Sequence, residues 1–151
     1  MTTVSKLAEE IAKGLGEMCP NLRRSVIRKL SLAVGAMSEG ETPNTSELSS
    51  LLPLPLERSD MREQWLRRLL KSPALICEQV MEAFARETLK FAMQNGQVIL
   101  LSMDQTDLGD RMAVLMITVR IGNRSLPLAW VADTGSANIG FDKQEQLLNQ
   151  V

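Results

Sequence analysis

The chain changes character at Gly96, and this change limits what it can fold into. Upstream of Gly96, apolar residues such as Leu7, Ile11 and Leu15 recur every four positions, which is the spacing of one face of an amphipathic helix. Downstream, apolar residues form short runs bounded by turn residues, which is typical of β-strands. The sequence therefore predicts a helical domain over residues 1–95 and a second domain over residues 96–151 that begins with strands.

Prolines, glycines and capping residues divide the first domain into helices. Asn44 with Glu47, and Asp60 with Glu63, have the spacing of capping boxes, in which polar side chains satisfy the free backbone N–H groups of a helix. Ser72-Pro73 combines a capping residue with a first-turn proline. The helices expected from these signals are, in order, one that ends at Pro20, then Leu22–Met37, Asn44–Leu52, Met61–Lys71 and a long one from Ser72 to Met93, before Asn95-Gly96.

The second domain opens with an apolar run and continues with a hairpin. Its expected elements are the strands Val98–Met103, Met112–Ile121 and Ser125–Val131 and a helix that opens with the capping pair Asp142 and Glu145. The first strand is apolar at nearly every position, which predicts burial on both faces of a sheet. Gly122-Asn123-Arg124 is short enough for a hairpin loop. Helices followed by strand, strand, strand and helix predict an α+β or α/β protein.

Composition excludes several classes of site. No histidine is present, so Ser-His-Asp and Cys-His catalysis and zinc sites with imidazole ligands are excluded. Cys19 and Cys77 match no metal or redox spacing and are expected as buried thiols. No apolar run reaches the roughly 18 residues of a membrane span, and no signal-peptide core is found near the N-terminus. We therefore expect a cytoplasmic protein, and its formal net charge of −1 leaves room only for local basic faces.

Asp104 directly follows the first predicted strand and opens the acidic turn Asp104–Asp110. A carboxylate at the tip of a buried strand can bind Mg²⁺, a hard cation that prefers carboxylate oxygen. Two-metal phosphoryl transfer needs two or three such carboxylates from separate elements. Thr106 could support Asp104 through a hydrogen bond. The alternative is that Asp, Thr and Gly gather here because turns favour them, and Asp107 and Asp110 fit that alternative in either case.

Asp133 begins the triplet Asp-Thr-Gly, which also occurs in aspartic proteases. Those enzymes pair two such carboxylates, so a single copy could work only in a homodimer. No second half with a flap-like hairpin is evident, and we interpret the triplet as a turn after the third strand.

Basic residues form two groups in the helical domain. On a helical wheel of Met61–Lys71, the apolar residues occupy one half, Arg67, Arg68 and Lys71 occupy the other, and Arg62 falls near the apolar edge. The second group, at the start of the second predicted helix, consists of Arg23, Arg24, Arg28 and Lys29. Such faces can contact phosphates, and a helix of this kind could enter a major groove. The alternative is that both groups are ordinary solvated faces.

Three stretches together carry a family resemblance. The run Ile-Leu-Leu-Ser-Met-Asp-Gln-Thr-Asp-Leu over Ile99–Leu108, followed by Leu-Pro-Leu-Ala-Trp over Leu126–Trp130, resembles the opening of the catalytic domain of DDE-type insertion-sequence transposases. In that family an apolar strand ends in an aspartate followed closely by threonine, and later strands run into a Pro-Leu-Ala-Trp-like end. Met61–Lys71 is similar to the family's helical segment, in which an aromatic residue and an arginine precede a short basic end. The resemblance extends from about Leu22 to Val151.

This resemblance implies an RNase H-like fold, Mg²⁺-dependent cleavage at transposon ends and strand transfer into target DNA. Of the family's catalytic residues, the resemblance assigns only one to this chain, which is Asp104 as a metal ligand. The family completes its triad with a later aspartate and a glutamate, and neither is expected before Val151. The sequence therefore predicts the N-terminal part of a transposase, with an incomplete catalytic domain that is inactive alone. Its expected partners are terminal-repeat DNA and another copy or an intact transposase.

A second hypothesis belongs to a different class. The chain would then be a non-enzymatic DNA-binding or interaction protein that regulates transposition, with the hairpin as a dimerisation surface. The two hypotheses differ in what they expect of Asp104, because only the enzyme needs this carboxylate for cleavage.

Overall fold

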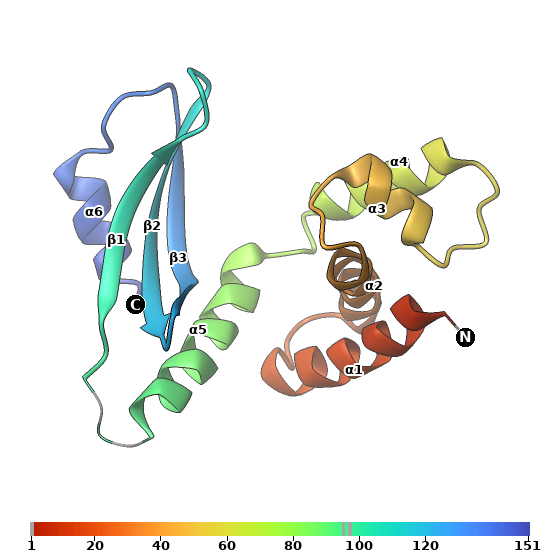
Figure 1. Cartoon of the computed structure of the whole chain (residues 1–151), viewed down its shortest axis with the longest axis horizontal. Helices are drawn as coiled ribbons and strands as arrows, with labels where there is room; N and C mark the ends of the chain where they lie inside the picture. Colours follow the sequence, from red (N-terminus) through yellow and green to blue (C-terminus); the bar gives the residue numbers. More distant parts are fainter. Residues whose placement is uncertain (1, 95, 97) are drawn as a thin grey trace. The chain divides into compact units, whose positions relative to one another are not determined.

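A computed structural model describes residues 2–94, 96 and 98–151. Over these residues the chain is a mixed α+β protein with six helices and a three-stranded antiparallel sheet (Figure 1). It divides into two compact units, Met1–Cys77 and Glu78–Val151. We call them the helical unit and the sheet unit and describe each by itself. The mixed α+β class expected from the sequence is thereby confirmed.

The helical unit contains α1 (Thr3–Met18), α2 (Arg24–Gly40), α3 (Thr45–Leu51) and α4 (Ser59–Leu70). Its core draws on all four helices and consists of Val4, Ala33, Ala36, Leu48, Leu52, Leu66 and Leu69. Leu66 and Leu69 are three positions apart, so they lie on the same face of α4 and turn it towards the core. Burying each such leucine stabilises the unit by about 1.5–3 kcal/mol.

Only part of the predicted capping chemistry is found. Asn44 is the N-cap of α3, where its side-chain oxygen accepts from the Ser46 N–H and its amide donates to Glu47 at 3.0 Å. The predicted cap of Asp60 with Glu63 is wrong, because α4 begins at Ser59 with Arg58 at the N-cap position. Arg58 instead binds the Asp60 carboxylate through two hydrogen bonds and lowers the pKa of that carboxyl.

The sheet unit contains α5 (Cys77–Met93), β1 (Leu101–Asp107), β2 (Met112–Ile121), β3 (Arg124–Thr134) and α6 (Phe141–Leu148). The sequence placed the boundary at residue 95, but α5 packs with the sheet, because Ala85 and Leu89 contact its buried cluster. The predicted helix start at Ser72 is wrong, since the Leu75 N–H bonds the Ser72 carbonyl in a separate turn. Asn95, expected to end this helix, lies outside the described residues.

The three strands follow one another in space in the order β1-β2-β3. The predicted hairpin is confirmed, with Gly122 at a φ of 61° in the turn between β2 and β3. The register shifts between Ile117 and Thr118, so that Leu128 of β3 has no partner residue on β2. Pro127 stands next to this irregularity, in a strand that pairs with β2 alone and can accommodate a residue without an N–H.

One face of this sheet is buried. Ala113, Leu115, Ile117 and Val119 alternate along β2 and form a core with Leu128, Ile139 and Leu147. The prediction that the first strand is buried on both faces is wrong. Leu101 is 47% exposed, because β1 pairs only with β2 and contributes chiefly Met103 to the core. Val98, which precedes β1, is 86% exposed.

Two further expectations concern burial and membranes. Cys19 is buried, which raises the pKa of its thiol, whereas Cys77 is exposed at the start of α5, so the prediction of a buried thiol is wrong there. Within the described parts of the chain, none of the helices has both the length and the apolar character needed to span a membrane.

Candidate nucleic-acid interface and the position of Asp104

Asp104 lies in the middle of β1 rather than at the tip of a strand. The strand continues to Asp107, so the predicted acidic turn over Asp104–Asp110 is wrong in its first half. Asp104 stands opposite Met116, which in turn stands opposite Trp130 of β3. Directly paired residues share a face, so these three side chains form a row across the sheet. Asp104 is exposed on this face, which is the one opposite the buried core.

The described residues do not form a metal site around Asp104. Ser102 and Thr106 share its face, whereas Asp107 points to the other face because side chains alternate along a strand. Nowhere in residues 2–94, 96 and 98–151 do three Asp, Glu, Cys or His side chains gather to hold an ion. One carboxylate cannot hold two divalent ions. The described part of the chain therefore does not fit the two-metal centre that the resemblance implies, and its geometry provides no catalytic step.

The residues beside Asp104 have structural partners. The Gln105 side-chain oxygen Oε1 accepts from the Ile139 N–H at 2.9 Å, and the side-chain Nε2 donates to the Asp107 carboxylate at 3.0 Å. Gln105 thus fastens the loop before α6 to β1. No hydrogen bond between Thr106 and Asp104 is found in the described residues. The suggested support of the Asp104 carboxylate by Thr106 stays a prediction.

Asp133 is not in a turn, because it lies within β3 and pairs with Ala113. Lys143 of α6 donates a hydrogen bond to its carboxylate. This bond and the lysine charge lower the pKa of Asp133. The first residue of the Asp-Thr-Gly triplet thus links β3 to α6.

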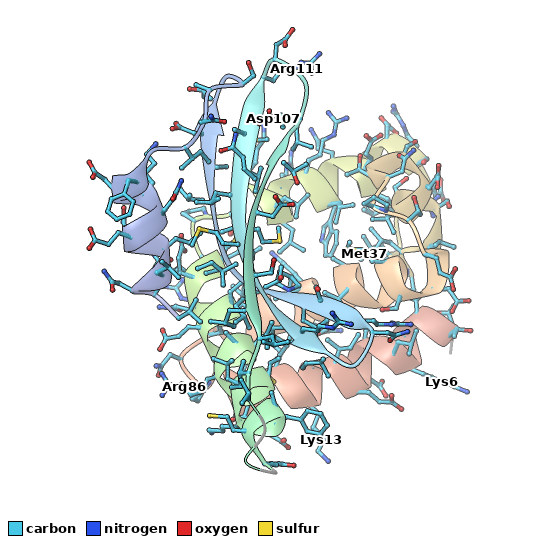
Figure 2. All side chains as sticks on the ribbon, turned by 60° about the vertical axis from the view of Figure 1, so that its left-hand side comes forward. Lys6, Lys13, Met37, Arg86, Asp107 and Arg111 are labelled. Carbon is cyan, nitrogen blue, oxygen red and sulfur yellow. The ribbon has the colours of Figure 1, made fainter. Side chains whose placement is uncertain are left out.

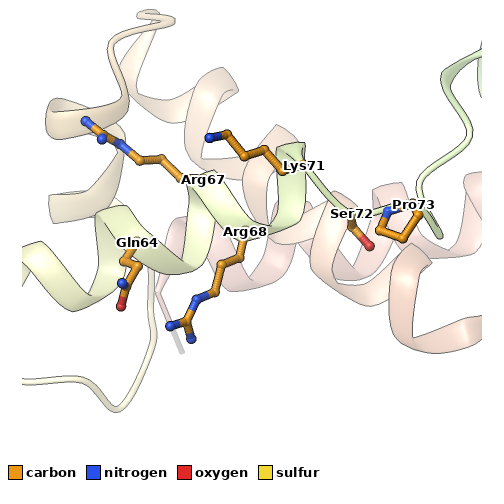
Figure 3. Close-up of a pocket in the computed structure, with 6 residues that line it drawn as sticks. All are labelled: Gln64, Arg67, Arg68, Lys71, Ser72 and Pro73. Carbon is orange, nitrogen blue, oxygen red and sulfur yellow. The ribbon is translucent and has the colours of Figure 1, made fainter.

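Three basic side chains lie near the C-terminal end of α4. An open depression of about 490 Å³ lies there, lined by Gln64, Arg67, Arg68, Lys71, Ser72 and Pro73 (Figure 3). At 3.6 residues per turn, the four lining residues from Gln64 to Lys71 span an arc of about 100° on the side away from Leu66. Figure 3 shows Arg67 and Lys71 extending from one side of this arc and Gln64 and Arg68 from the other. The predicted grouping of the three cations on one face is therefore what the structure presents.

The charges of this depression are only partly neutralised. Arg67 donates to Glu63 at 2.7 Å, in a pair one helical turn apart. Arg68 and Lys71 take part in none of the ion pairs found in the described residues. Both are exposed, so they are available to an anion that approaches from solvent.

Arg62 stands apart from these three cations. It is one turn before Leu66 and therefore falls on the core-facing side of α4, where it is half-buried. Its Nε is enclosed and has no hydrogen-bond partner among the described residues. The aliphatic stem of an arginine can cover apolar surface in such a position, so Arg62 fits packing better than a contact with phosphate.

The second basic group lies on another helix than the first. Arg23, Arg24, Arg28 and Lys29 are exposed at the N-terminal end of α2. The core residues that join α2 to α4 lie further along, beginning at Ala33. At a rise of 1.5 Å per residue, Ala33 is roughly 14 Å along the axis from Arg24. Arg24 thus lies well before the residues through which α2 packs against α4.

Gln64, Ser72 and Pro73 line the depression but were not expected from the sequence as site residues. Gln64 could have been found, because it is one turn before Arg68 on the same face. Comparison of the chain with protein-family models, with curated proteins and with solved structures finds no match. The function of the chain is therefore inferred from the cationic depression, the position of Asp104 and the sequence resemblance.

Proposed function

We propose that the chain corresponds to the N-terminal part of a DDE-type insertion-sequence transposase and that its helical unit binds transposon-end DNA. The observation that carries this proposal is the open cationic depression on α4, with Arg68 and Lys71 outside any described ion pair. Cations on an exposed helix face contact DNA phosphates and release counterions. The group Arg23, Arg24, Arg28 and Lys29 at the start of α2 supplies a second contact.

The order of strands and helix in the sheet unit supports the same proposal. Three antiparallel strands in the order β1-β2-β3 are followed by α6, which is the order expected for the start of an RNase H-like domain. Asp104 lies on the first of these strands. In the complete enzyme, Asp104 would bind Mg²⁺ together with an aspartate and a glutamate from elsewhere. A cytoplasmic location belongs to this proposal, and the two free cysteines agree with it.

A second candidate function follows from the lack of a three-carboxylate cluster in the described residues. The chain would then bind DNA without cleaving it and would regulate transposition, alone or with another copy. Asp104→Ala separates the two candidates when it is introduced into a complete transposase that contains this chain. Loss of end cleavage with unchanged affinity for DNA supports the enzyme, whereas no effect of Asp104→Ala supports the regulator.

DNA binding itself is tested by fluorescence anisotropy. Labelled duplexes of terminal-repeat and scrambled sequence are titrated with the whole chain at several salt concentrations. We expect the double variant Arg68→Glu with Lys71→Glu to lower affinity by roughly tenfold or more, because two phosphate contacts become repulsive. Asp104→Ala should leave the affinity unchanged, because Asp104 belongs to the other unit.

The matched control reverses two lysines of α1. Lys6 and Lys13 are exposed and extend from α1 (Figure 2), so Lys6→Glu with Lys13→Glu changes the net charge of the helical unit equally. If both double variants weaken binding alike, only the overall charge matters, and the α4 site is wrong. If the wild-type chain has equal affinity for terminal-repeat and scrambled DNA, recognition of transposon ends is wrong.

A further inference from the structure

The Glu63 carboxylate is fixed beside the cationic depression. Its Oε1 accepts from Arg67 Nη2 at 2.7 Å and from the Thr45 hydroxyl at 3.4 Å. The Glu63 side chain is 25% exposed, against 65% for Arg67. Thr45 is the first residue of α3, so this carboxylate is held from α3 as well as from α4, while the guanidinium reaches into solvent.

A guanidinium binds carboxylate and phosphate with the same forked geometry. Arg67 lines the depression and is also bound to Glu63, so a phosphate that enters the depression competes with Glu63 for this one side chain. Arg68 and Lys71 have no such competitor among the described ion pairs. Two cations are therefore open to phosphate, and the third is shared.

We propose that Glu63 acts as a built-in phosphate mimic that holds Arg67 and limits the affinity of the α4 site for nucleic-acid phosphate. This inference depends on the proposed DNA binding and assigns Glu63 the role of a regulatory competitor. When phosphate binds, the Arg67 guanidinium turns from Glu63 to the phosphodiester. The Thr45 hydroxyl keeps the carboxylate at the α3–α4 contact, where it can recapture Arg67 when the DNA leaves.

The test replaces Glu63 with a neutral side chain. Glu63→Gln retains an oxygen that can accept from Thr45, so the fold should be kept, and thermal unfolding checks this. We expect tighter binding of duplex DNA, by roughly fivefold to tenfold at low salt. We also expect the slope of log Kd against the logarithm of the salt concentration to increase by about 0.9, which is the contribution of one further phosphate contact. Glu63→Met, a second neutral residue of similar length, should give the same two shifts.

The control and a double-mutant cycle separate competition from general charge. Glu10 is exposed on α1, so Glu10→Gln removes one carboxylate from the same unit without freeing a cation of the depression. In an Arg67→Gln background, Glu63→Gln should have no effect beyond that of Glu10→Gln, because Glu63 acts through Arg67.

The outcomes distinguish this inference from the proposed function. If wild-type chain binds DNA and loses affinity through Arg68→Glu with Lys71→Glu, DNA binding at α4 stands. Should Glu63→Gln and Glu63→Met then behave like Glu10→Gln, the competitor role is overturned alone. If the wild-type chain shows no affinity for duplex DNA, both proposals are overturned together.

Discussion

Lys143 of α6 donates a hydrogen bond to the carboxylate of Asp133 in β3, and this bond ties the last helix to the sheet. The bond and the lysine charge lower the pKa of Asp133. A carboxyl whose pKa is lower in the folded state stabilises the fold at pH values above its unfolded pKa of about 3.9. That contribution is lost as the pH falls through the folded pKa.

We therefore expect Asp133→Asn to lower the Tm at neutral pH and to have a diminishing effect below about pH 4. Thermal unfolding followed by circular dichroism at neutral and acid pH measures this difference. Asp110→Asn is the control, because Asp110 is exposed in the turn between β1 and β2 and belongs to none of the described ion pairs. A Tm difference for Asp133→Asn that is the same at both pH values would contradict the role of this ion pair.

Gly35 of α2 provides a second prediction, because a side chain there would meet the backbone of α1. A Cβ on Gly35 would lie 3.1 Å from the Val4 carbonyl oxygen and 3.3 Å from the Ala8 nitrogen. Both neighbours are backbone atoms, so the helices must separate to admit a methyl group. We expect Gly35→Ala to destabilise the helical unit by about 1–3 kcal/mol.

Gly14 is the matched control for this change. It is also a helical glycine, in α1, but a Cβ there would meet no atom of the described residues within 4 Å. Gly14→Ala should therefore stabilise the chain by about 0.5–1 kcal/mol, because alanine loses less backbone entropy in a helix. Urea unfolding of both variants measures the two signs, and equal effects would mean that the α1–α2 contact is not tight.

The sequence predicted well those elements whose signal is local. The span Met112–Ile121 of β2 matches, because alternating apolar residues and the adjoining hairpin loop define both of its ends. Asn44 caps α3 as its spacing with Glu47 predicts. Arg67, Arg68 and Lys71 were expected on one face of a helix, and they line one depression.

The wrong predictions on Asp104 and Arg62 arise because partners distant in sequence determine the outcome, whereas the one on Ser72 arises from a competing local turn. Asp104 was placed at a strand tip because the apolar run ends there, but pairing with β2 carries the strand on to Asp107. Ser72-Pro73 has the local pattern of a helix start, yet the Ser72 hydroxyl accepts from the Ala74 N–H in a separate turn. Arg62 lies near the apolar edge on a helical wheel, and only the packing of α4 shows that its Nε is enclosed.

Gln105 gives a third prediction, on the loop before α6. Its side-chain oxygen is the acceptor for the Ile139 N–H, and Ile139 is buried in the core of the sheet unit. Gln105→Met removes this acceptor and leaves a backbone donor without its partner, which should cost about 1–3 kcal/mol. Thr106→Ala, at the next and exposed position of β1, should change stability by about 0.5 kcal/mol or less. Urea unfolding that ranks the two variants equally would contradict the role of Gln105.

The final prediction concerns the two sides of α4. We expect substitutions on the buried side to change stability and substitutions on the basic side to change DNA binding. Leu66 is 3% exposed in the core of the helical unit, whereas Leu70, four positions on, is 60% exposed. Leu66→Ala should lower the free energy of unfolding by about 2–5 kcal/mol, since it leaves a cavity beneath α4. Leu70→Ala should change it by about 0.5 kcal/mol or less.

Lys71→Ala, on the exposed side, should leave the free energy of unfolding unchanged and weaken duplex binding. Anisotropy measures this binding under conditions where every variant is folded. If Lys71→Ala instead destabilises the unit as Leu66→Ala does, the basic side of α4 serves the fold, and the proposed DNA contact there is wrong.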